Sequence, residues 1–364
     1  MRLSAALAIV LMSLPLSVAL AQPRRLEIGL DRSNLTWESL DVQAQVMRGI
    51  RALGGEWVRD ALSGHSPATN SAFVQELELA KRNNLKFLAI VGVGSEDYDT
   101  GYRNPNAGEL FDKVCGWKAG SPEVSRINLA KFKVRLKAQL DAVKAAGLTI
   151  DAFEIGNEYN SSCFDADVPF GRLATPQEFQ TMVLGYAHLL RAAADIIESP
   201  NYFLHAPIVT FGIAHLSDAD DPFDHHIENP DRIIDVLKNL GGFDYLDNAE
   251  YHVAGIGSHI YVSPDVIDTK ASQILTGDSL VGGGRPVWIT EWGFNTWAFR
   301  TRSDLTRKEA FTRFYAMLRR EPIRLGPNFV YAYSQHKDSG WGLVGKGGQL
   351  LPEASVITEQ SREH

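Results

Sequence analysis

Two glutamates stand at corresponding places in two apolar stretches of the sequence. Glu158 ends the run FEIGNE that begins at Phe153, and Glu291 follows the run from Val287 to Thr290 in RPVWITEWG. Both runs have the composition of strands buried on both faces. A lone buried carboxylate is costly, so each glutamate must reach solvent or serve a site. Together they predict a two-carboxylate site, in which one group donates a proton and the other attacks a carbon or activates water.

The rest of the chain alternates predicted strands and helices, which is typical of a parallel α/β sheet. About eight such units in one domain favour a single (β/α)8 TIM barrel over an open doubly wound sheet. No phosphate-cradling glycine motif follows the first strand, which also disfavours the dinucleotide-binding alternative. The predicted strands are 26–31, 56–58, 86–93, 153–156, 202–211, 255–262, 285–291 and 328–333. The predicted helices are 40–53, 72–82, 122–146, 176–197, 232–240, 264–275 and 305–320.

Catalytic groups of such a barrel stand at the carboxyl ends of its strands. Arg59 beside Glu291 lowers the pKa of that carboxyl, and Tyr261 can donate a hydrogen bond to it. Two facing carboxylates can cleave a glycosidic bond, and Asn157 is placed to bind a hydroxyl of the sugar. The other carboxyl of the pair, Glu158, needs a site that favours its protonated form. The other polar residues predicted at strand ends are Asp31, Asp60, His259, Tyr333, Gln335 and His336. The aromatic residues placed to stack on sugar faces are Trp292, Trp297 and Trp341.

These motifs resemble the clan of retaining β-glycosidases on (β/α)8 barrels, which includes cellulase-like and β-xylosidase-like families. Asn157 and Glu158 in EIGNEYN resemble the Asn-Glu pair that supplies the clan's acid/base at strand four. Glu291 in WITEWG resembles its nucleophile at strand seven. The resemblance covers nearly the whole chain after residue 21 and implies hydrolysis of β-glycosidic bonds of an oligo- or polysaccharide by double displacement.

Three further stretches carry the same resemblance. Arg59 in WVRD matches the arginine of strand two, and His259 and Tyr261 in SHIYV match the His-x-Tyr of strand six. The tail WGLVGKGGQLLP resembles the clan's segment after strand eight. The clan often has a tryptophan on strand eight, where this sequence has Tyr331 and Tyr333. That difference bears on the floor of the sugar-binding site.

The first 21 residues have the pattern of a signal peptide. Arg2 precedes an apolar run from residue 5 to residue 20, and Ala19-Leu20-Ala21 fits the small-x-small cleavage rule. We expect cleavage near Ala21, a catalytic domain over 22–364, and a secreted or periplasmic location. A membrane anchor is disfavoured because the run is short and Pro15 interrupts it. No later stretch is long and apolar enough to span a bilayer.

Two cysteines are the only ones in the sequence. Cys115 and Cys163 fit one disulfide in an exported protein, and two free thiols are the alternative. Both are expected in loops that follow strands.

Charge and composition exclude some classes of function. The net charge of −8 argues against a nucleic-acid partner. No His-x-His follows the first strand, so a metal-dependent barrel hydrolase is disfavoured. A metal site in the acidic loop that holds Asp224, His225, His226 and Glu228 is also disfavoured against a solvated loop.

We therefore expect a monomer that needs no cofactor or metal and acts on a carbohydrate. The alternatives are a carbohydrate-binding protein on an inactive barrel and a transglycosylase that uses the same two glutamates. Sugar identity, linkage and endo or exo action stay open at this point.

Overall fold

The computed structural model describes residues 24–62, 67–170, 172, 174–203, 205–216, 253–301, 304–334, 340–345 and 347–362. In these residues β1 to β8 pair in chain order, all parallel, and β8 pairs with β1 to close a barrel. The predicted single (β/α)8 barrel is confirmed. The strands are β1 (Ile28–Asp31), β2 (Trp57–Ala61), β3 (Lys86–Val91), β4 (Ala152–Asn157), β5 (Ile208–Leu216), β6 (Val253–Tyr261), β7 (Val287–Trp292) and β8 (Leu325–Val330).

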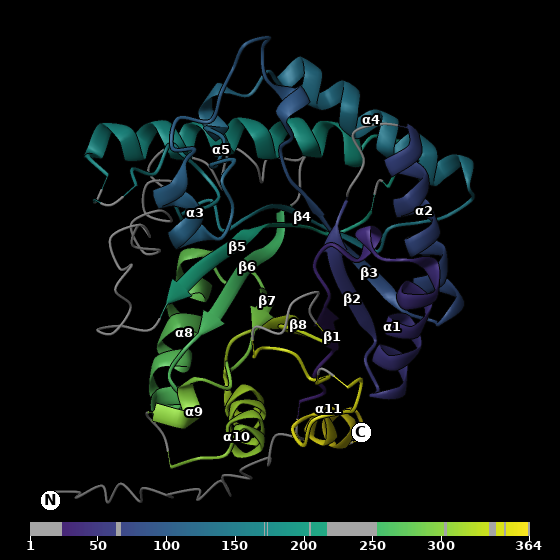
Figure 1. Ribbon diagram of the computed structural model, residues 1–364, viewed down its shortest axis with the longest axis vertical. Coiled ribbons are helices and arrows are strands. Elements are labelled where there is room, and N and C mark those ends of the chain that lie inside the picture. The colour runs from purple at the N-terminus through teal and green to yellow at the C-terminus, as the bar shows by residue number, and fades with distance from the viewer. Residues whose placement is uncertain are drawn as a thin grey trace, which may run out of the picture.

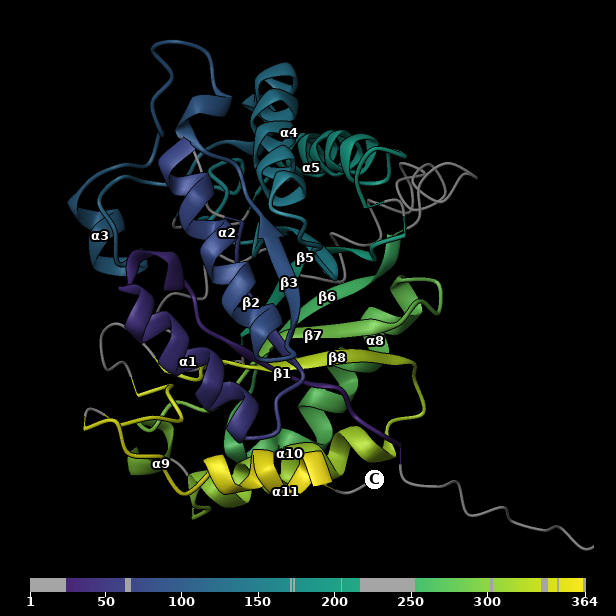
Figure 2. The ribbon, with the colours of Figure 1, turned by 90° about the vertical axis from the view of Figure 1, so that its right-hand side faces the viewer.

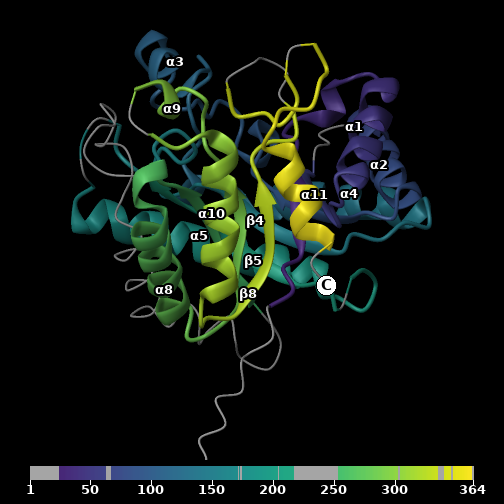
Figure 3. The same cartoon turned by 90° about the horizontal axis from the view of Figure 1, so that it is seen from below.

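Helices surround the barrel, as Figure 1 shows. They are α1 (Leu40–Ala52), α2 (Pro67–Arg82), α3 (Glu109–Cys115), α4 (Leu129–Ala145), α5 (Pro176–Ile197), α8 (Ser272–Val281), α9 (Ala298–Thr301), α10 (Arg307–Arg320) and α11 (Ala354–Arg362). In Figure 2, α10 and α11 lie side by side, and in Figure 3 α11 lies between α10 and α1. Helix α11 therefore covers the barrel where the last strand, β8, pairs with the first strand, β1.

The lower part of the barrel interior is filled by apolar side chains. One buried cluster takes a residue from each of six strands: Trp57, Leu88, Ala152, Val209, Trp288 and Phe329. The rings of Trp288 and Phe329 meet Trp57 edge to face, with centroids 5.7 and 6.2 Å apart. The barrel is thus a packed core here, and polar groups are confined to its upper part, near the carboxyl ends of the strands.

Some element boundaries agree with the sequence predictions and others do not. Helix α5 begins at Pro176 as predicted, because the Thr175 side chain accepts a hydrogen bond from the backbone N–H of Glu178. The helix predicted from residue 122 begins only at Leu129, where Asn128 is the N-cap. The strand predicted from residue 202 begins only at Ile208. Helix α11 was not predicted at all, since the glycine-rich stretch before it suggested an irregular tail.

Several predictions fall outside the described residues. These are the signal peptide at 1–21, the helix at 232–240, the acidic loop with Asp224, His225, His226 and Glu228, and the strand-end residues Gln335 and His336. Among the described residues, no helix is both long enough and apolar enough to cross a membrane.

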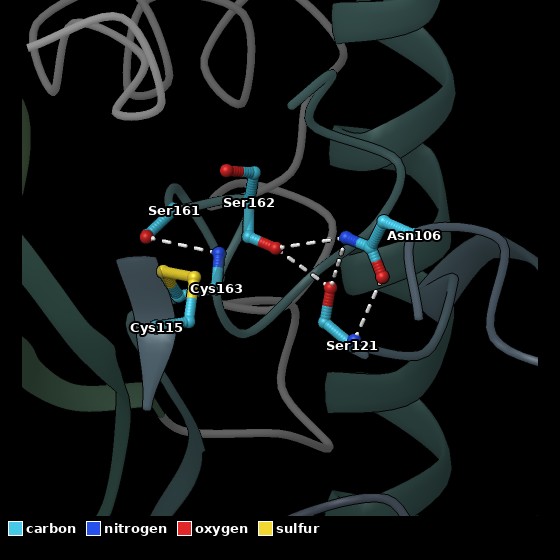
Figure 4. Close-up of a disulfide and its surroundings, with 6 residues drawn as sticks. All are labelled: Asn106, Cys115, Ser121, Ser161, Ser162 and Cys163. Carbon is cyan, nitrogen blue, oxygen red and sulfur yellow. Dashed lines mark hydrogen bonds between the residues drawn. A yellow bond between two sulfur atoms is a disulfide. The ribbon is translucent and has the colours of Figure 1, made fainter. Parts of the chain in front are cut away.

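Cys115 and Cys163 form a disulfide, with their Cα atoms 5.5 Å apart (Figure 4). Cys115 ends the short helix α3 in the segment between β3 and α4, and Cys163 lies in the loop after β4. The bond therefore joins two neighbouring loops at the end of the barrel where the carboxyl ends of the strands lie.

Replacing both cysteines with serine is expected to lower the free energy of unfolding by about 3–4 kcal/mol. The cross-link closes a loop of 48 positions, and without it the unfolded chain gains conformational entropy. Guanidinium-induced unfolding of the variant and of the oxidised protein measures the difference. Equal unfolding midpoints would contradict the prediction.

Candidate active site

The guanidinium of Arg59 lies at the centre of the upper barrel and is fully buried. It contacts three carboxylates: Nη1 lies 2.7 Å from Asp31 Oδ2 and 2.5 Å from Glu291 Oε1, and Nε lies 2.6 Å from Glu154 Oε2. Its Nη2 donates to Asn157 Oδ1 at 2.8 Å. A buried charge is tolerated only when it is paired and hydrogen-bonded, and Arg59 meets both conditions through partners on three other strands, β1, β4 and β7.

Glu291 is held in its charged form. Burial by itself would raise its pKa, but His259 and Arg59 together with a hydrogen bond from Tyr261 bring the pKa below the ordinary value. The Tyr261 hydroxyl donates to Glu291 Oε2, while Arg59 holds Oε1. The sequence prediction that Arg59 and Tyr261 both reach Glu291 therefore agrees with the geometry.

Glu158 faces the same space from the other side. It directly follows β4 with φ of +46°, a left-handed conformation that only a few per cent of non-glycine residues adopt. Its Oε1 lies 2.7 Å from His259 Nδ1, whose other ring nitrogen lies 3.3 Å from Arg59 Nη2. One oxygen of Glu158 and one of Glu291 lie within 4.8 Å of each other. Two carboxyl groups therefore face one another across the mouth of the barrel.

His259 connects the two carboxylates. Its Nδ1 lies 2.7 Å from Glu158 and 3.5 Å from Glu291 Oε2. Burial lowers the pKa of this imidazole, but the two carboxylates outweigh burial and leave the pKa above its ordinary value. The charged imidazole is therefore favoured, and its Nδ1–H donates to Glu158 Oε1.

The three side chains of Glu158, His259 and Glu291 also lie close enough to surround a cation. Arg59 already brings a positive charge to 2.5 Å from Glu291 and to 3.3 Å from the imidazole. A metal ion there would be repelled by the guanidinium, so the donor set fits proton transfer better than metal binding.

Strand β7 explains why Glu291 points inward. Trp288 lies inside the barrel, and strict alternation would put Trp292 inside as well and Glu291 outside. The register of β7 shifts between Ile289 and Trp292 against β8, and its register against β6 also shifts next to Glu291. Such an irregularity re-aims side chains, and here it turns the glutamate into the barrel.

The prediction that Trp292 stacks on sugar is therefore wrong. Its side chain is fully buried outside the barrel and stacks on Phe314 of α10, with ring centroids 4.1 Å apart. Tyr333 was predicted as a substrate-binding or supporting residue at the end of strand eight, and it also points away from the site. Its hydroxyl reaches helix α1 beside Gly49, and its ring belongs to the outer apolar core. Asp60 also points outward, and its carboxylate accepts hydrogen bonds from the backbone of the loop after β1.

Trp341 does lie near the site. Its ring centroid is 5.0 Å from that of Tyr261 and 6.0 Å from that of Tyr331, the first residue after β8. Tyr261 also meets Tyr331 edge to face at 6.1 Å. These three aromatic rings line the side of the site next to Glu291, and Tyr331 takes the strand-eight position at which the sequence lacks tryptophan.

Two buried carboxylates of the site received no role from the sequence. Glu154 is fully buried and stands inside β4, four residues before Glu158. The sequence prediction treats the run FEIGNE as apolar. A charged residue inside a strand buried on both faces nevertheless indicates a buried partner for that charge. Asp31 was expected at a strand end, and the structure places it against Arg59.

The buried carboxylates predict a pH dependence of stability. Burial and the nearby Glu291 raise the pKa of Asp31 to about 7, although Arg59 acts in the opposite direction. In the unfolded chain an aspartate has a pKa of about 3.9, so the folded state binds this proton more tightly. Its contribution to stability is therefore present at low pH and is lost as the pH rises from about 4 to about 7.

The side-chain amide of Asp31→Asn does not titrate in this pH range. We expect its free energy of unfolding to fall less steeply than that of the wild type between pH 4 and pH 7. Urea unfolding over this pH range measures both slopes. Two parallel curves, displaced only by a constant, would contradict the raised pKa.

Comparison with models of known protein families finds no match for this chain, and comparison with curated proteins finds none either. Solved structures do share its fold. An AHE enzyme from Alicyclobacillus herbarius superposes with a TM-score of 0.59 at 12% identity, covering 94% of this chain and 99% of that one. A GH5_18 protein from Bifidobacterium longum subsp. infantis gives 0.58 at 13%, covering 93% and 79%. A hyperthermostable endo-1,4-β-D-mannanase from Thermotoga petrophila gives 0.57 at 13%, covering 93% and 100%.

The chain thus shares the (β/α)8 barrel fold of these solved structures. The resemblance drawn from the sequence is confirmed at the level of the fold, and the chain carries two facing glutamates where that fold places its reactive groups.

Proposed function

We propose that the protein is an exported retaining glycoside hydrolase that cleaves β-glycosidic bonds of an oligo- or polysaccharide. The observation that carries this proposal is the pair Glu158 and Glu291, whose nearest oxygens lie within 4.8 Å. Carboxyl groups about 5–5.5 Å apart are typical of retaining enzymes, whereas inverting enzymes need about 6.5–9.5 Å to admit a water molecule.

The environments of the two glutamates support a division of roles. Glu291, charged and held by Arg59 and Tyr261, is the nucleophile that attacks the anomeric carbon. Glu158 is the acid/base. As the acid of the first step, Glu158 acts in its protonated form, with His259 Nδ1 2.7 Å from its Oε1. Glu158 then gives that proton to the glycosidic oxygen as the bond to the leaving group breaks.

The second half of the reaction reverses these roles. Glu158, now a carboxylate, takes a proton from water, and the water oxygen attacks the anomeric carbon of the glycosyl-enzyme. The bond to Glu291 breaks, and the carboxylate returns to its contacts with Arg59 and Tyr261. Asn157 accepts a hydrogen bond from Arg59 through Oδ1, so its NH2 group is left to donate to a sugar hydroxyl.

The disulfide supports export as part of the proposal. Disulfides persist in oxidising compartments such as the periplasm and the extracellular space, and both cysteines of the chain are used in one. The signal-like first 21 residues favour the same location.

A screen over aryl β-glycosides and polysaccharides tests the proposal. We expect the wild type to release the aryl alcohol from at least one glycoside and Glu291→Gln to release none, since the amide cannot form the covalent intermediate. Tight binding of a glycan by both proteins without any hydrolysis would instead favour a carbohydrate-binding protein on an inactive barrel.

A further inference from the structure

A cavity of about 380 Å³ lies at the end of the barrel where the strands begin, opposite the two glutamates of the active site. Its lining comes from the residue just before β1 strand pairing starts, from the turn between α1 and β2, and from the last turns of α11. The polar side chains in this lining are Arg25, Arg51, Glu56, Thr358, Ser361 and Arg362. The proposed reaction uses none of them.

The turn between α1 and β2 fits closely against the end of α11. Gly54, in that turn, has a φ of +91°, and a Cβ on it would lie 2.0 Å from the hydroxyl oxygen of Ser361. Ser361 in turn donates a hydrogen bond to the carbonyl of Thr358 at 3.0 Å. Figures 1 and 2 both show α11 beside this end of α1. The wall of the cavity is therefore built from elements that pack on one another.

Positive charge is in excess around this cavity. Arg25 pairs with Glu56 at 2.7 Å, which leaves two more guanidinium groups in the lining. Arg51 Nη1 donates to the carbonyl of Gly55 at 3.3 Å, and Arg362 has no hydrogen bond or ion pair among the residues that the structure describes. Three arginines and one glutamate give the described lining a charge of +2, in a chain whose net charge is −8. Like charges that meet at one cavity repel each other, and an anion among them relieves the repulsion.

We propose that this cavity binds an oxyanion of the phosphate or carboxylate class, at a site separate from the active site. A guanidinium presents a planar fork of N–H donors that matches the oxygens of either group. The N–H donors of Arg362 and the hydroxyl of Thr358 are available to such a ligand. The cavity has room for on the order of ten water molecules, so the oxyanion can be a free ion or can belong to a sugar. The inference does not depend on the proposed function, because neither active-site glutamate takes part.

Isothermal titration calorimetry of the whole protein with inorganic phosphate, at constant ionic strength, tests the proposal. We expect saturable binding, and Arg51→Ala and Arg362→Ala should each weaken it about three- to tenfold, because each removes a charged donor at a partly exposed site. Glucuronate and glucose 6-phosphate are titrated in parallel. Tighter binding of either than of phosphate assigns the oxyanion to a sugar, and weaker binding assigns the site to the free ion.

Glu56→Gln should have the opposite effect. The amide removes the negative charge that repels an anion and releases Arg25 from its ion pair, so the affinity for phosphate should rise about three- to tenfold. A purely structural role of Glu56 would not raise the affinity. A lower affinity in this variant would therefore contradict the proposal.

Arg82→Ala is the matched control. Arg82 is also an exposed arginine in the last turn of a helix, α2, and it pairs with a glutamate at 2.6 Å, but it does not line the cavity. Its replacement should leave phosphate affinity unchanged. An equal loss in Arg82→Ala would overturn the site, and so would heats that rise without saturation for phosphate and both sugar acids and match those of chloride.

Discussion

Glu291→Ala is expected to lower kcat by about 10⁵-fold on every glycoside, whatever its leaving group. Without the carboxylate no covalent glycosyl-enzyme forms, and loss of a nucleophile typically has an effect of this order. Arg59 keeps Asp31 and Glu154 as partners in the variant, so the protein should still fold. Steady-state kinetics on aryl glycosides with graded leaving-group pKa measures the loss.

Added azide gives the Glu291→Ala experiment a second readout. A small anion can enter the space left by the side chain and attack the anomeric carbon directly, which gives the glycosyl azide of inverted, α configuration. Glu359→Ala, which removes an exposed glutamate of α11, is the control and should keep wild-type rates. Activity of Glu291→Ala above about a hundredth of the wild-type rate would assign the nucleophile to another residue.

Glu158→Ala is expected to slow turnover of substrates with poor leaving groups by about 10²–10⁴-fold, the usual contribution of a general acid. Activated aryl glycosides need little protonation, so their first step should change far less. Azide should partly rescue this variant, because an anion attacks the glycosyl-enzyme without help from a base. Two inversions then give the β-glycosyl azide, the opposite anomer from that of Glu291→Ala.

The comparison of the two variants fixes the roles. A dependence on leaving group in Glu291→Ala, with uniform inactivity in Glu158→Ala, would reverse the assignment. The β-azide from one variant and the α-azide from the other would exclude an explanation by misfolding, since each product requires an ordered site.

Much of this site could be predicted because its strands end where apolar runs meet polar residues. Glu158, Asn157, Arg59, His259 and Tyr261 all follow from that rule, and the structure brings them together. Strands buried on both faces read as continuous apolar runs, so their ends are visible in a sequence.

The direction of side chains was less predictable. Trp292 and Tyr333 also stand at strand ends, but they point into the outer core. For Trp292 the cause is the register shift of β7, which depends on pairing with β6 and β8 and leaves no local mark in the sequence. The alternation rule applied from Phe329 would have put Tyr331 and Tyr333 both inside, but β8 ends at Val330, so the rule no longer holds at Tyr333.

Glu154 and helix α11 were missed for different reasons. Glu154 is charged inside a strand, and only its contact with Arg59 shows that it belongs to the site. Helix α11 is short and follows a glycine-rich stretch, and its burial against α10 stabilises it more than its own propensity does. In both cases the decisive feature is a tertiary contact, with Arg59 for Glu154 and with α10 for α11.

Trapping the covalent intermediate tests the central claim most directly. A 2-deoxy-2-fluoro-β-glycoside with an activated leaving group, made from the sugar that the screen identifies, should inactivate the wild type. Mass spectrometry of the intact protein should then show one added fluoroglycosyl group, and peptide mapping should place it on Glu291. A label on Glu158 or on any other residue, or turnover that yields the α-anomer first and leaves no label, would contradict the account.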